Sequence, residues 1–383
     1  MKTVSGKVTF VTQYYRHAGG GLGRYEDFLV PELLKKVPIR LISASPVRFP
    51  GGIVGLARLS GRDLHAVAAN YPCRLRDPLV DSLVHLCNQN LALALLTNHI
   101  QKSVITVHDI ITYVDLKSRS LGGTDYGPIA LLLLRLNAWA IRRADRVIAI
   151  SNHTKRDLVE ILGVDAAKVV VIPHGVDHTV YRPLAAPTEF LQRFDLAQNA
   201  KYVLYVGSRH PRKNLGTLCR AMARVRTIVP QARLLMVGPS GTPDQERALS
   251  ASIQAAGLDQ SVDFISFVPP AELPLVYNMS TLFVYPSMYE GFGLPPLEAM
   301  ACGCPAVVSD ATSLPEVVGN GGVLVDPQDV EGWVEAITAI LKDDSLRDDL
   351  RQRGLERAAM FDWARTAEEI IQVYREMGIG RCI

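Results

Sequence analysis

Long hydrophobic runs are missing from the 383-residue sequence. A membrane-spanning helix needs roughly 20 consecutive apolar residues, and the longest candidate, Ile129 to Ile141, is interrupted by Arg135 and Asn137. The first residues, Met1 to Lys7, are polar and lead directly into a predicted strand, so they lack the apolar segment of a secretory leader. We therefore expect a cytoplasmic protein, with peripheral association at the inner face of the membrane left open.

Cysteine is scarce, and its spacing does not match a metal site. Cys302-Gly303-Cys304 is one residue short of a C-x-x-C motif and spans a predicted helix end and strand start. Buried or inert thiols in a reducing compartment are the expected state of such residues. The six cysteines are Cys73, Cys87, Cys219, Cys302, Cys304 and Cys382. The sequence also lacks an Asp-x-Asp motif and any His/Asp cluster, so we expect neither a metal nor a bound cofactor.

An overall excess of one charge is also absent, since the net charge is only +3. The charges are nevertheless unevenly placed. Residues 1–184 hold 23 basic against 14 acidic residues, a net +9, and residues 185–383 hold 18 against 24, a net −6. There is no dense basic run with interleaved aromatics, so nucleic acid is not an expected partner. The basic amino half indicates an anionic partner there, either a membrane surface or a phosphate-bearing acceptor.

Short apolar strands alternate with amphipathic helices along most of the chain. This alternation is typical of an α/β protein with parallel sheets, and the length suits two or three domains. Pro183 to Ala200 is rich in proline and alanine and is interpreted as a linker. We predict domains at residues 1–183 and 184–365. Pro46 to Pro78 departs from the alternation, and a short helix and loops are expected there.

One stretch, Thr281 to Asp310, organises the rest of the chain. Leu282 to Tyr285 are apolar and suit a buried parallel strand. Pro295-Pro296 favours a helix start, because proline is tolerated in the first turn. Gly303 is a typical residue just beyond a helix end. The stretch therefore predicts a strand, a glycine-containing loop, a short helix and a second strand.

Two carboxylates, Glu290 and Glu298, stand eight residues apart in this unit. Glu290 is predicted in the loop at the carboxyl end of the strand, and Glu298 in the first turn of the helix. Ligands of doubly wound sheets bind at this edge, where a helix amino terminus favours an anion. A sugar nucleotide supplies a pyrophosphate for the N–H groups and hydroxyls for the acids. The alternative is that Glu298 only complements the helix dipole.

A cationic loop follows another predicted strand, Tyr202 to Val206. After Gly207 it contains Arg209, Arg212 and Lys213. Lysine and arginine side chains at such a position can neutralise a pyrophosphate leaving group. The alternative is an ordinary solvated basic loop.

A glycine-rich stretch follows the first predicted strand, Lys7 to Thr12. Gly19 to Gly23 are interpreted as a turn before the helix Tyr25 to Lys36, an arrangement that can cradle a phosphate or serve as a structural turn. Nicotinamide binding is disfavoured, because the next strand, Ile39 to Ile42, ends without the acid that would hold an adenosine ribose.

His108 follows the predicted strand Val104 to Val107. A histidine at the carboxyl end of a strand can donate a hydrogen bond to a sugar or accept a proton, and the alternative is a structural histidine bonded to nearby backbone. The adjacent Asp109 is expected to order the loop. Ile110 to Gly127 is long for a connection within a domain and is interpreted as a mobile acceptor loop.

Pro128 to Arg143 is predicted to be a helix, apolar early and basic at its end. One interpretation is an interfacial helix on an anionic membrane. The other is a core helix whose last arginines complement the helix dipole, and the second is favoured.

The segment E-G-F-G-L-P-P-L-E-A-M-A-C-G, which begins at Glu290, resembles the E-x7-E element of the retaining glycosyltransferases of family 4. Further resemblances are G-G-L-G-R-Y, ending at Tyr25, V-I-T-V-H-D, ending at Asp109, and I-P-H-G-V-D, ending at Asp177. They cover nearly the whole chain. The resemblance implies a GT-B fold, with two Rossmann-like domains facing across a cleft and a last helix, at about 366–383, that crosses back to the first domain.

The resemblance also implies roles for individual residues. It implies catalytic roles for His108, Glu290, Lys213 and Arg209. It implies donor contacts from Gly21, Gly23, Gly207, Arg212, Gly291, Phe292, Gly293, Leu294 and Glu298. It places Arg24, Asn88 and Asp109 on the acceptor side. The chain departs from the family at Ser208, where an arginine is common, and Arg209 or Arg212 is expected to take its role.

The implied reaction is metal-independent transfer of a hexose from a nucleotide sugar with retention of configuration. The acceptor would be a saccharide or a polyprenyl-linked saccharide. The segment G-S-R-H-P-R-K-N resembles bacterial mannosyl- and rhamnosyltransferases of surface polysaccharides, which favours mannose and a GDP-sugar over a UDP-sugar. Alternatives are a sugar-nucleotide epimerase or phosphorylase of the same fold, or a non-catalytic partner of another transferase.

Overall fold

The computed structural model describes residues 8–13, 15, 21–44, 83–118, 121, 126–185, 192–194, 196–197 and 199–379. The chain divides into two compact units. The amino-terminal unit contains Met1–Lys117, Gly123–Gly175 and Trp363–Ile383, and the carboxyl-terminal unit contains Ser118–Gly122 and Val176–Asp362. The predicted domain boundaries at residues 183 and 365 stay predictions. The predicted loops and short helix of Pro46 to Pro78 lie outside the described residues.

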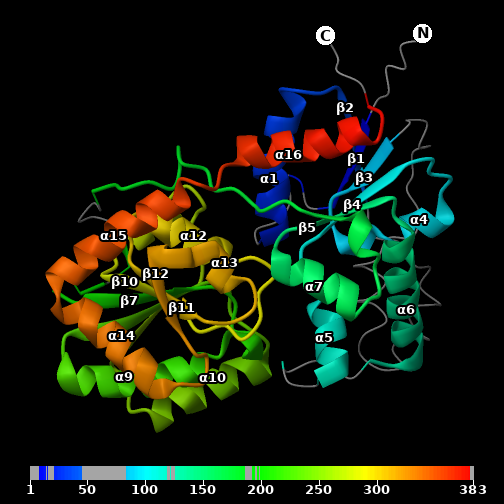
Figure 1. The fold of residues 1–383 in the computed structure, drawn as a ribbon. Helices are drawn as coiled ribbons and strands as arrows, with labels where there is room; N and C mark the ends of the chain where they lie inside the picture. Colours follow the sequence, from blue (N-terminus) through cyan, green and yellow to red (C-terminus); the bar gives the residue numbers. More distant parts are fainter. Residues whose placement is uncertain are drawn as a thin grey trace. The chain divides into compact units, whose positions relative to one another are not determined.

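The described part of the amino-terminal unit contains a parallel six-stranded sheet in the order β2-β1-β3-β4-β5-β6. The strands are β1 (Val8–Thr12), β2 (Ile39–Ser43), β3 (Leu83–Leu86), β4 (Ser103–Val107), β5 (Arg146–Ala149) and β6 (Val169–Val171). Every residue of β1, β3 and β4 is buried, as expected for central strands covered by helices on both faces (Figure 1). The strand order reverses between β1 and β3, and such a switch point is where ligands of this fold class bind.

The bounds of two helices in this unit correct two predictions. The helices of the unit are α1 (Gly21–Leu34), α4 (Ala94–Thr97), α5 (Ile111–Ser118), α6 (Pro128–Arg143), α7 (Asn152–Glu160) and α16 (Trp363–Glu376), with short 3₁₀ turns η1 (Gln89–Leu91) and η2 (Ala166–Lys168). The predicted turn at Gly21 to Gly23 is wrong, because these residues already form the first turn of α1. Gly19 and Gly20 lie outside the described residues.

The predicted mobile loop at Ile110 to Gly127 is also wrong over its first part, which forms α5. The Asp109 carboxylate accepts a hydrogen bond from the backbone N–H of Ile111 at 3.1 Å and so orders the start of the helix. The Tyr113 hydroxyl donates to the carbonyl of Leu134 in α6 at 3.0 Å. Local capping and this tether hold a segment whose composition alone favoured a loop.

The last helix, α16, packs against α1, so the predicted return of the chain to the amino-terminal unit is confirmed (Figure 1). The rings of Trp363 and Phe28 stack at 6.1 Å between centroids. The Tyr374 hydroxyl lies 2.5 Å from Nδ1 of the buried His85. These contacts place the carboxyl-terminal helix in the core of the unit that contains the start of the chain.

The carboxyl-terminal unit contains a second parallel six-stranded sheet, in the order β12-β11-β10-β7-β8-β9 within the described residues. Its strands are β7 (Lys201–Val206), β8 (Ala232–Val237), β9 (Val262–Ile265), β10 (Leu282–Tyr285), β11 (Ala306–Ser309) and β12 (Gly322–Val325). Its helices are α9 (Leu215–Ile228), α10 (Pro243–Ala255), α11 (Leu273–Met279), α12 (Leu294–Ala301), α13 (Leu314–Val318), α14 (Val330–Lys342) and α15 (Asp344–Ala358), with short turns η3 (Pro211–Lys213) and η4 (Gly319–Gly321). From edge to edge this is the Rossmann order, with its switch point between β7 and β10.

The backbone is tightly packed where β7 and β8 end. Gly238 has a φ of +144°, and a Cβ atom built on it would lie 2.2 Å from the carbonyl oxygen of Gly207. Backbone atoms cannot yield as a flexible side chain can, so only glycine fits here. The close approach fixes the first residue of the loop that leads to Lys213.

We expect Gly238→Ala to lower the free energy of unfolding by roughly 2–4 kcal/mol, the combined cost of a strained φ and a backbone clash. Urea denaturation measures the loss. Gly257→Ala is the matched control, because Gly257 also has a positive φ, +63°, but open space around its Cβ position. Equal losses in the two variants would show that the contact with Gly207 contributes nothing.

Candidate functional site

Two loops meet at the switch point of the carboxyl-terminal sheet. One leaves β7 and contains the turn η3, and the other leaves β10 and leads to α12. The backbone N–H of Met288 donates to the carbonyl of Arg212 at 2.8 Å, and the Ser287 hydroxyl oxygen lies 3.3 Å from the same carbonyl. The chain therefore joins residues about 75 positions apart in the sequence at one edge of the sheet.

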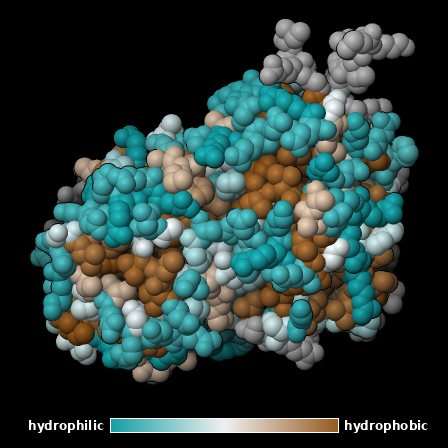
Figure 2. All heavy atoms as spheres, in the orientation of Figure 1, coloured by the Kyte–Doolittle hydropathy of each residue, from teal (hydrophilic) through white to brown (hydrophobic). Residues whose placement is uncertain are grey.

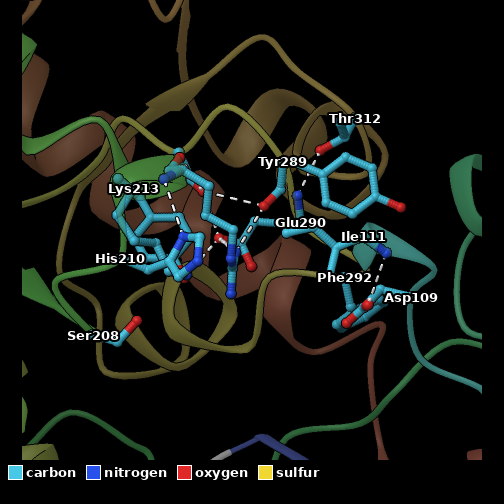
Figure 3. Close-up of polar contacts among 12 residues, drawn as sticks. Asp109, Ile111, Ser208, His210, Lys213, Tyr289, Glu290, Phe292 and Thr312 are labelled. Carbon is cyan, nitrogen blue, oxygen red and sulfur yellow. Dashed lines mark hydrogen bonds and ion pairs between the residues drawn. The ribbon is translucent and has the colours of Figure 1, made fainter. Parts of the chain in front are cut away.

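A buried ion cluster lies where these loops meet (Figure 3). Oε1 of Glu290 accepts hydrogen bonds from Nζ of Lys213 at 2.5 Å and from Nη1 of Arg212 at 2.8 Å. The Ser287 hydroxyl donates to the same oxygen at 2.6 Å. Lys213 and Glu290 are only 4% and 9% exposed, so water screens their attraction weakly.

The charge of this cluster follows from its geometry. Burial by itself would raise the pKa of Glu290, but the charges of Lys213 and Arg212 outweigh it and lower that pKa from its usual 4.5 to about 2. Glu290 is therefore ionised at neutral pH. One carboxylate and two cations leave a net charge of +1 at the carboxyl end of the sheet.

Aromatic side chains line the cluster on the sheet side. The Lys213 ammonium donates to the Tyr285 hydroxyl and lies 4.6 Å from the centroid of the Tyr285 ring, a cation–π contact. The ring of Tyr205 stacks on that of Tyr285 at 6.0 Å. Burial, with the nearby Glu290 charge, raises the pKa of Tyr285 well above its usual value, so Tyr285 is a neutral phenol. The rings therefore help to hold the ammonium in place.

The backbone around Glu290 is held by the loop after β11. Oγ1 of Thr312 accepts a hydrogen bond from the backbone N–H of Glu290 at 3.0 Å (Figure 3). The Ser313 hydroxyl lies 3.0 Å from the carbonyl of Glu290 and 2.7 Å from that of Phe292. Thr312 has a φ of +54°, an uncommon value for a threonine. The third loop thus fixes the position of the acid.

The Gly291 to Leu294 segment leads into α12, which begins at Leu294 with Gly293 as its N-cap. Gly293 has a φ of +121° and makes no side-chain cap, and a Cβ atom there would lie 2.8 Å from Leu314 Cδ2. Phe292 is buried, with its ring edge against Phe361 at 5.9 Å. Pro295 and Pro296 have no N–H, and the N–H of Leu297 donates to the carbonyl of Gly293 at 3.3 Å, so the predicted donor contacts of Gly291 to Leu294 stay predictions.

Glu298 lies in the second turn of α12, so its predicted place in the first turn is wrong. The helix begins at Leu294, one residue before the two prolines, and this shifts the acid along its axis. Glu298 is 2% exposed, and its Oε2 accepts a hydrogen bond from the hydroxyl of Tyr277 in α11 at 2.9 Å. The alternative of a first-turn acid that only complements the dipole therefore does not apply.

Arg209 points away from the cluster. It forms an ion pair with Glu246 of α10 and lies over the ring of Phe264 at 4.8 Å. The structure thus brings Arg212 together with Lys213 and Glu290, and not Arg209. Ser208 occupies the position where the resemblance leads one to expect an arginine (Figure 3).

His108 follows β4 in the amino-terminal unit and is buried. Its Nε2 lies 2.9 Å from the carbonyl of Cys87, and its backbone N–H donates to the Gln89 side chain at 3.1 Å. Its ring meets the edge of the Tyr25 ring at 4.6 Å between centroids. Burial lowers the pKa of His108 to about 4, so the imidazole is neutral at pH 7, with the Nε2 proton on the carbonyl.

The acceptor-side residues have local structural contacts. Oδ1 of Asn88 accepts a hydrogen bond from the backbone N–H of Asn90 at 2.9 Å and caps η1. Asp109 orders the start of α5. Gly21, Gly23 and Arg24 all lie in the first turn of α1. Their predicted roles toward an acceptor or donor stay predictions.

Two family models match the chain. The model described as Glycosyltransferase Family 4 matches residues 79–180, and the model described as Glycosyl transferases group 1 matches residues 188–357. The second match contains both E-x7-E acids and the Lys213 loop. The chain contains a glycosyltransferase domain of each of these two families.

Among curated proteins, this glycosyltransferase is similar to the O-antigen chain mannosyltransferase B of Escherichia coli, with 28% identity over 96% of this chain and 99% of that protein. It is 37% identical to the D-inositol 3-phosphate glycosyltransferase of Nocardia farcinica, over 61% of this chain and 53% of that protein. Among solved structures, the sucrose-phosphate synthase of Thermosynechococcus elongatus superposes with a TM-score of 0.73 at 23% identity, covering 97% and 99% of the two chains. That likeness confirms the predicted GT-B fold.

The described residues also give information on metal ligands, membrane-spanning helices and cysteines. Within the part of the glycosyltransferase that the structure describes, no three His, Cys, Asp or Glu side chains are grouped so as to hold a metal. No described helix is long and apolar enough to cross a membrane. The described cysteines, Cys87, Cys219, Cys302 and Cys304, are buried free thiols, as expected.

Sequence reasoning missed several residues of the site. Ser287, Tyr285 and Thr312 contact Glu290 or Lys213 directly, yet nothing in their local sequence marks them. Ser313 had a usable signal, because Ser313 to Gly319 resembles a family motif. The structure shows that this motif positions the backbone of the first acid.

Proposed function

We propose that this glycosyltransferase transfers a hexose, mannose in the first instance, from a nucleotide sugar to a saccharide or lipid-linked saccharide, with retention of configuration and without a metal. The observation that carries the proposal is the Lys213–Glu290–Arg212 cluster at the switch point of the carboxyl-terminal sheet. Its three side chains sum to a charge of +1, and Glu290 stands four residues before Leu294, the first residue of α12, where the helix dipole favours an anion. A diphosphate is the anion that fits both features.

The chemical step needs stabilisation of the departing diphosphate. Fixed charges do this best when they are aimed at the developing charge in a dry site. Lys213 and Arg212 are held in place by Glu290 and by Tyr285, so they need little reorganisation when the bond breaks. In this proposal Glu290 orients the two cations and meets hydroxyls of the donor sugar. His108, neutral at pH 7, is the residue proposed for the sugar on the side of the amino-terminal unit.

The donor and acceptor are the finer part of the proposal. Similarity to an O-antigen chain mannosyltransferase supports mannose, and the G-S-R-H-P-R-K-N segment favours a GDP-sugar. Peripheral association with the inner leaflet belongs to the same proposal, because a lipid-linked acceptor is presented at a membrane.

A transfer assay tests the proposed function. Purified protein, in buffer containing EDTA, is incubated with GDP-mannose and a polyprenyl-linked saccharide, and mass spectrometry and NMR identify the product. The expected product carries one added hexose with the anomeric configuration of the donor. Release of free nucleotide at the same rate without any acceptor would instead indicate an epimerase, and dependence on a divalent metal would overturn the metal-free step.

We expect Glu298→Ala to weaken nucleotide binding by about tenfold, because a carboxylate that accepts hydroxyl hydrogen bonds is worth about 1.5 kcal/mol. The choice between donor sugars should change little. Calorimetric titration of the nucleoside diphosphate measures the first effect and competition between donors the second. Glu298→Gln, which keeps an acceptor for Tyr277, is the control for packing. Unchanged nucleotide affinity in Glu298→Ala would remove this acid from the donor site.

Arg212 and Arg209 form a matched pair of test positions. We expect Arg212→Ala to lower kcat/KM by about 10- to 100-fold, because it removes a cation from the cluster. Arg209→Ala should change kcat/KM less than about threefold, since Arg209 contacts Glu246 instead. Steady-state kinetics of both variants decides which arginine replaces the one missing at Ser208. The reverse order would assign the role to Arg209.

A further inference from the structure

Tyr277 holds the second acid of the E-x7-E element, and none of the sequence motifs assigns it a role. It lies in α11, which packs against α12, the helix that contains Glu298. The Tyr277 hydroxyl donates a hydrogen bond to Oε2 of Glu298 at 2.9 Å. One oxygen of the carboxylate therefore has a defined direction before any ligand is present.

This hydrogen bond lies beneath the surface of the carboxyl-terminal unit. The side chains of Tyr277 and Glu298 belong to residues that are 0% and 2% exposed. On the outside, α15 packs against α12, and Figure 2 shows mostly hydrophilic surface on the left, where Figure 1 draws α15. Water therefore competes weakly for the carboxylate, and a hydrogen bond in such surroundings is stronger than one in solvent.

The Tyr277 hydroxyl is itself held in place, because its ring is packed among other rings. The ring lies edge-on to that of Phe283 in β10, at 5.8 Å between centroids, and edge-on to that of Tyr181, at 6.3 Å. Phe283 is fully buried in a central strand of the sheet. A tyrosine has only two side-chain torsions, so packing of the ring fixes the position of its hydroxyl.

The backbone of α11 is anchored next to Tyr277. Oδ1 of Asn278 accepts a hydrogen bond from the backbone N–H of Leu184 at 2.7 Å, and its Nδ2 donates to the carbonyl of Arg182 at 3.0 Å. These bonds join α11 to the segment that precedes β7, within the same unit. A side chain can orient a functional group precisely only when its own support is rigid, and Tyr277 meets this condition.

We propose that Tyr277 is a positioning residue of the donor site, which orients the Glu298 carboxylate for the nucleotide before the nucleotide binds. A glutamate side chain loses rotational freedom when its carboxylate is fixed, and a loose carboxylate would have to be ordered during binding. The bond to Tyr277 transfers this loss to folding. The inference rests on the proposed function, because it takes Glu298 to contact the donor nucleotide.

Tyr277→Phe tests the proposal, since it removes the hydroxyl and keeps the ring. In calorimetric titrations of the full chain with GDP, and with UDP in parallel, we expect the nucleotide to bind about three- to fivefold more weakly, the cost of ordering one flexible side chain. The KM for the donor should rise by a similar factor while kcat is unchanged, because the contact is made equally in the ground state and the transition state.

Two further variants distinguish positioning from a general loss of packing. Tyr277→Phe/Glu298→Ala should bind the nucleotide no more weakly than Glu298→Ala, because the tyrosine acts only through the acid. Tyr202→Phe is the matched control. Tyr202 is 2% exposed in the same unit, and its hydroxyl accepts a hydrogen bond from the backbone N–H of Ala197 at 2.8 Å. Tyr202→Phe thus also loses a buried hydroxyl, but its nucleotide affinity should equal that of the original protein.

Three results would overturn the positioning role. They are an unchanged nucleotide affinity in Tyr277→Phe, additive losses in the double variant, and a loss in Tyr202→Phe as large as that in Tyr277→Phe. Glu298→Ala, measured beside them, separates this proposal from the proposed function. A loss in Glu298→Ala without one in Tyr277→Phe refutes only the positioning by Tyr277, whereas unchanged affinity in Glu298→Ala refutes the donor contact of the acid and the positioning with it.

Discussion

Lys213→Ala is expected to lower kcat by about 30- to 150-fold with little change in the free energy of unfolding. The factor corresponds to a loss of about 2–3 kcal/mol of transition-state stabilisation, the worth of a hydrogen bond to a charged group. Folding should survive because Glu290 keeps two of its partners, Arg212 and Ser287. Single-turnover kinetics at saturating donor isolates the chemical step.

Lys201 provides the matched control for this lysine. It lies at the opposite end of strand β7, where its ammonium donates to the carbonyl of Leu341 at 2.5 Å. Lys201→Ala also removes a lysine charge, but from the end of β7 opposite to the loop that contains Lys213, so its kcat should match that of the original protein. Equal rates for Lys213→Ala and the original protein would remove the lysine from the chemical step.

Glu290→Ala is expected to lower the free energy of unfolding by about 3–5 kcal/mol, because it leaves the buried Lys213 and its neighbour Arg212 without their shared anion. Urea denaturation measures the loss. Glu246→Ala also removes an arginine's partner, but at a site where the carboxylate is 33% exposed, so it should cost no more than about 1 kcal/mol. Losses of equal size would show that the burial of the cluster has no energetic consequence.

A second variant separates stability from chemistry at this position. Lys213→Met/Glu290→Leu removes the charges of the pair together, so we expect it to regain most of the stability lost in Glu290→Ala, while its kcat is lowered at least as much as in Lys213→Ala. The contribution of Glu290 to the free energy of unfolding also depends on pH, with a defined sign. Because the folded pKa of Glu290 is lowered to about 2 from 4.5, its contribution to stability is present above pH 4.5 and is lost as pH falls toward 2. In Glu290→Ala this part of the acid destabilisation should disappear.

Local patterns predicted the regular elements well. Leu282 to Tyr285 and Pro128 to Arg143 have the predicted bounds, because an apolar run ended by proline and a helix opened by proline are decided by neighbouring residues. The fold class followed from the alternation of strands and helices together with the family resemblance. The last helix returns to the amino-terminal unit, as the resemblance implied.

Two elements of the amino-terminal unit differ from their predictions because of contacts that local composition does not show. The segment after Asp109 has few helix signals, and it forms α5 because a capping carboxylate and a hydrogen bond to α6 hold it. Gly21 to Gly23 indicated a turn but form the start of α1, since glycine is tolerated where backbone N–H groups have no helical partner.

The contacts of the site were equally hidden. The ion pair of Lys213 with Glu290 spans 77 positions and depends on β7 and β10 being neighbours, which strand order alone determines. The choice between Arg209 and Arg212 depends on η3, whose turn carries Arg212 to Glu290 and leaves Arg209 beside α10. Residues three apart in a loop cannot be distinguished by composition.

The central claim is that Lys213 contacts the diphosphate of the donor. It is tested most directly by GDP binding to the original protein and to Lys213→Ala, measured as the shift of the thermal unfolding midpoint over a range of nucleotide concentrations. A ligand at 100 times its dissociation constant adds about 2.7 kcal/mol to the free energy of unfolding. UDP, dTDP and ADP are each measured in the same way for comparison. The account predicts a rise in the unfolding midpoint of the original protein, largest with GDP, and a much smaller rise in Lys213→Ala. Equal stabilisation of the two proteins, or none by any of the four nucleotides, would contradict it.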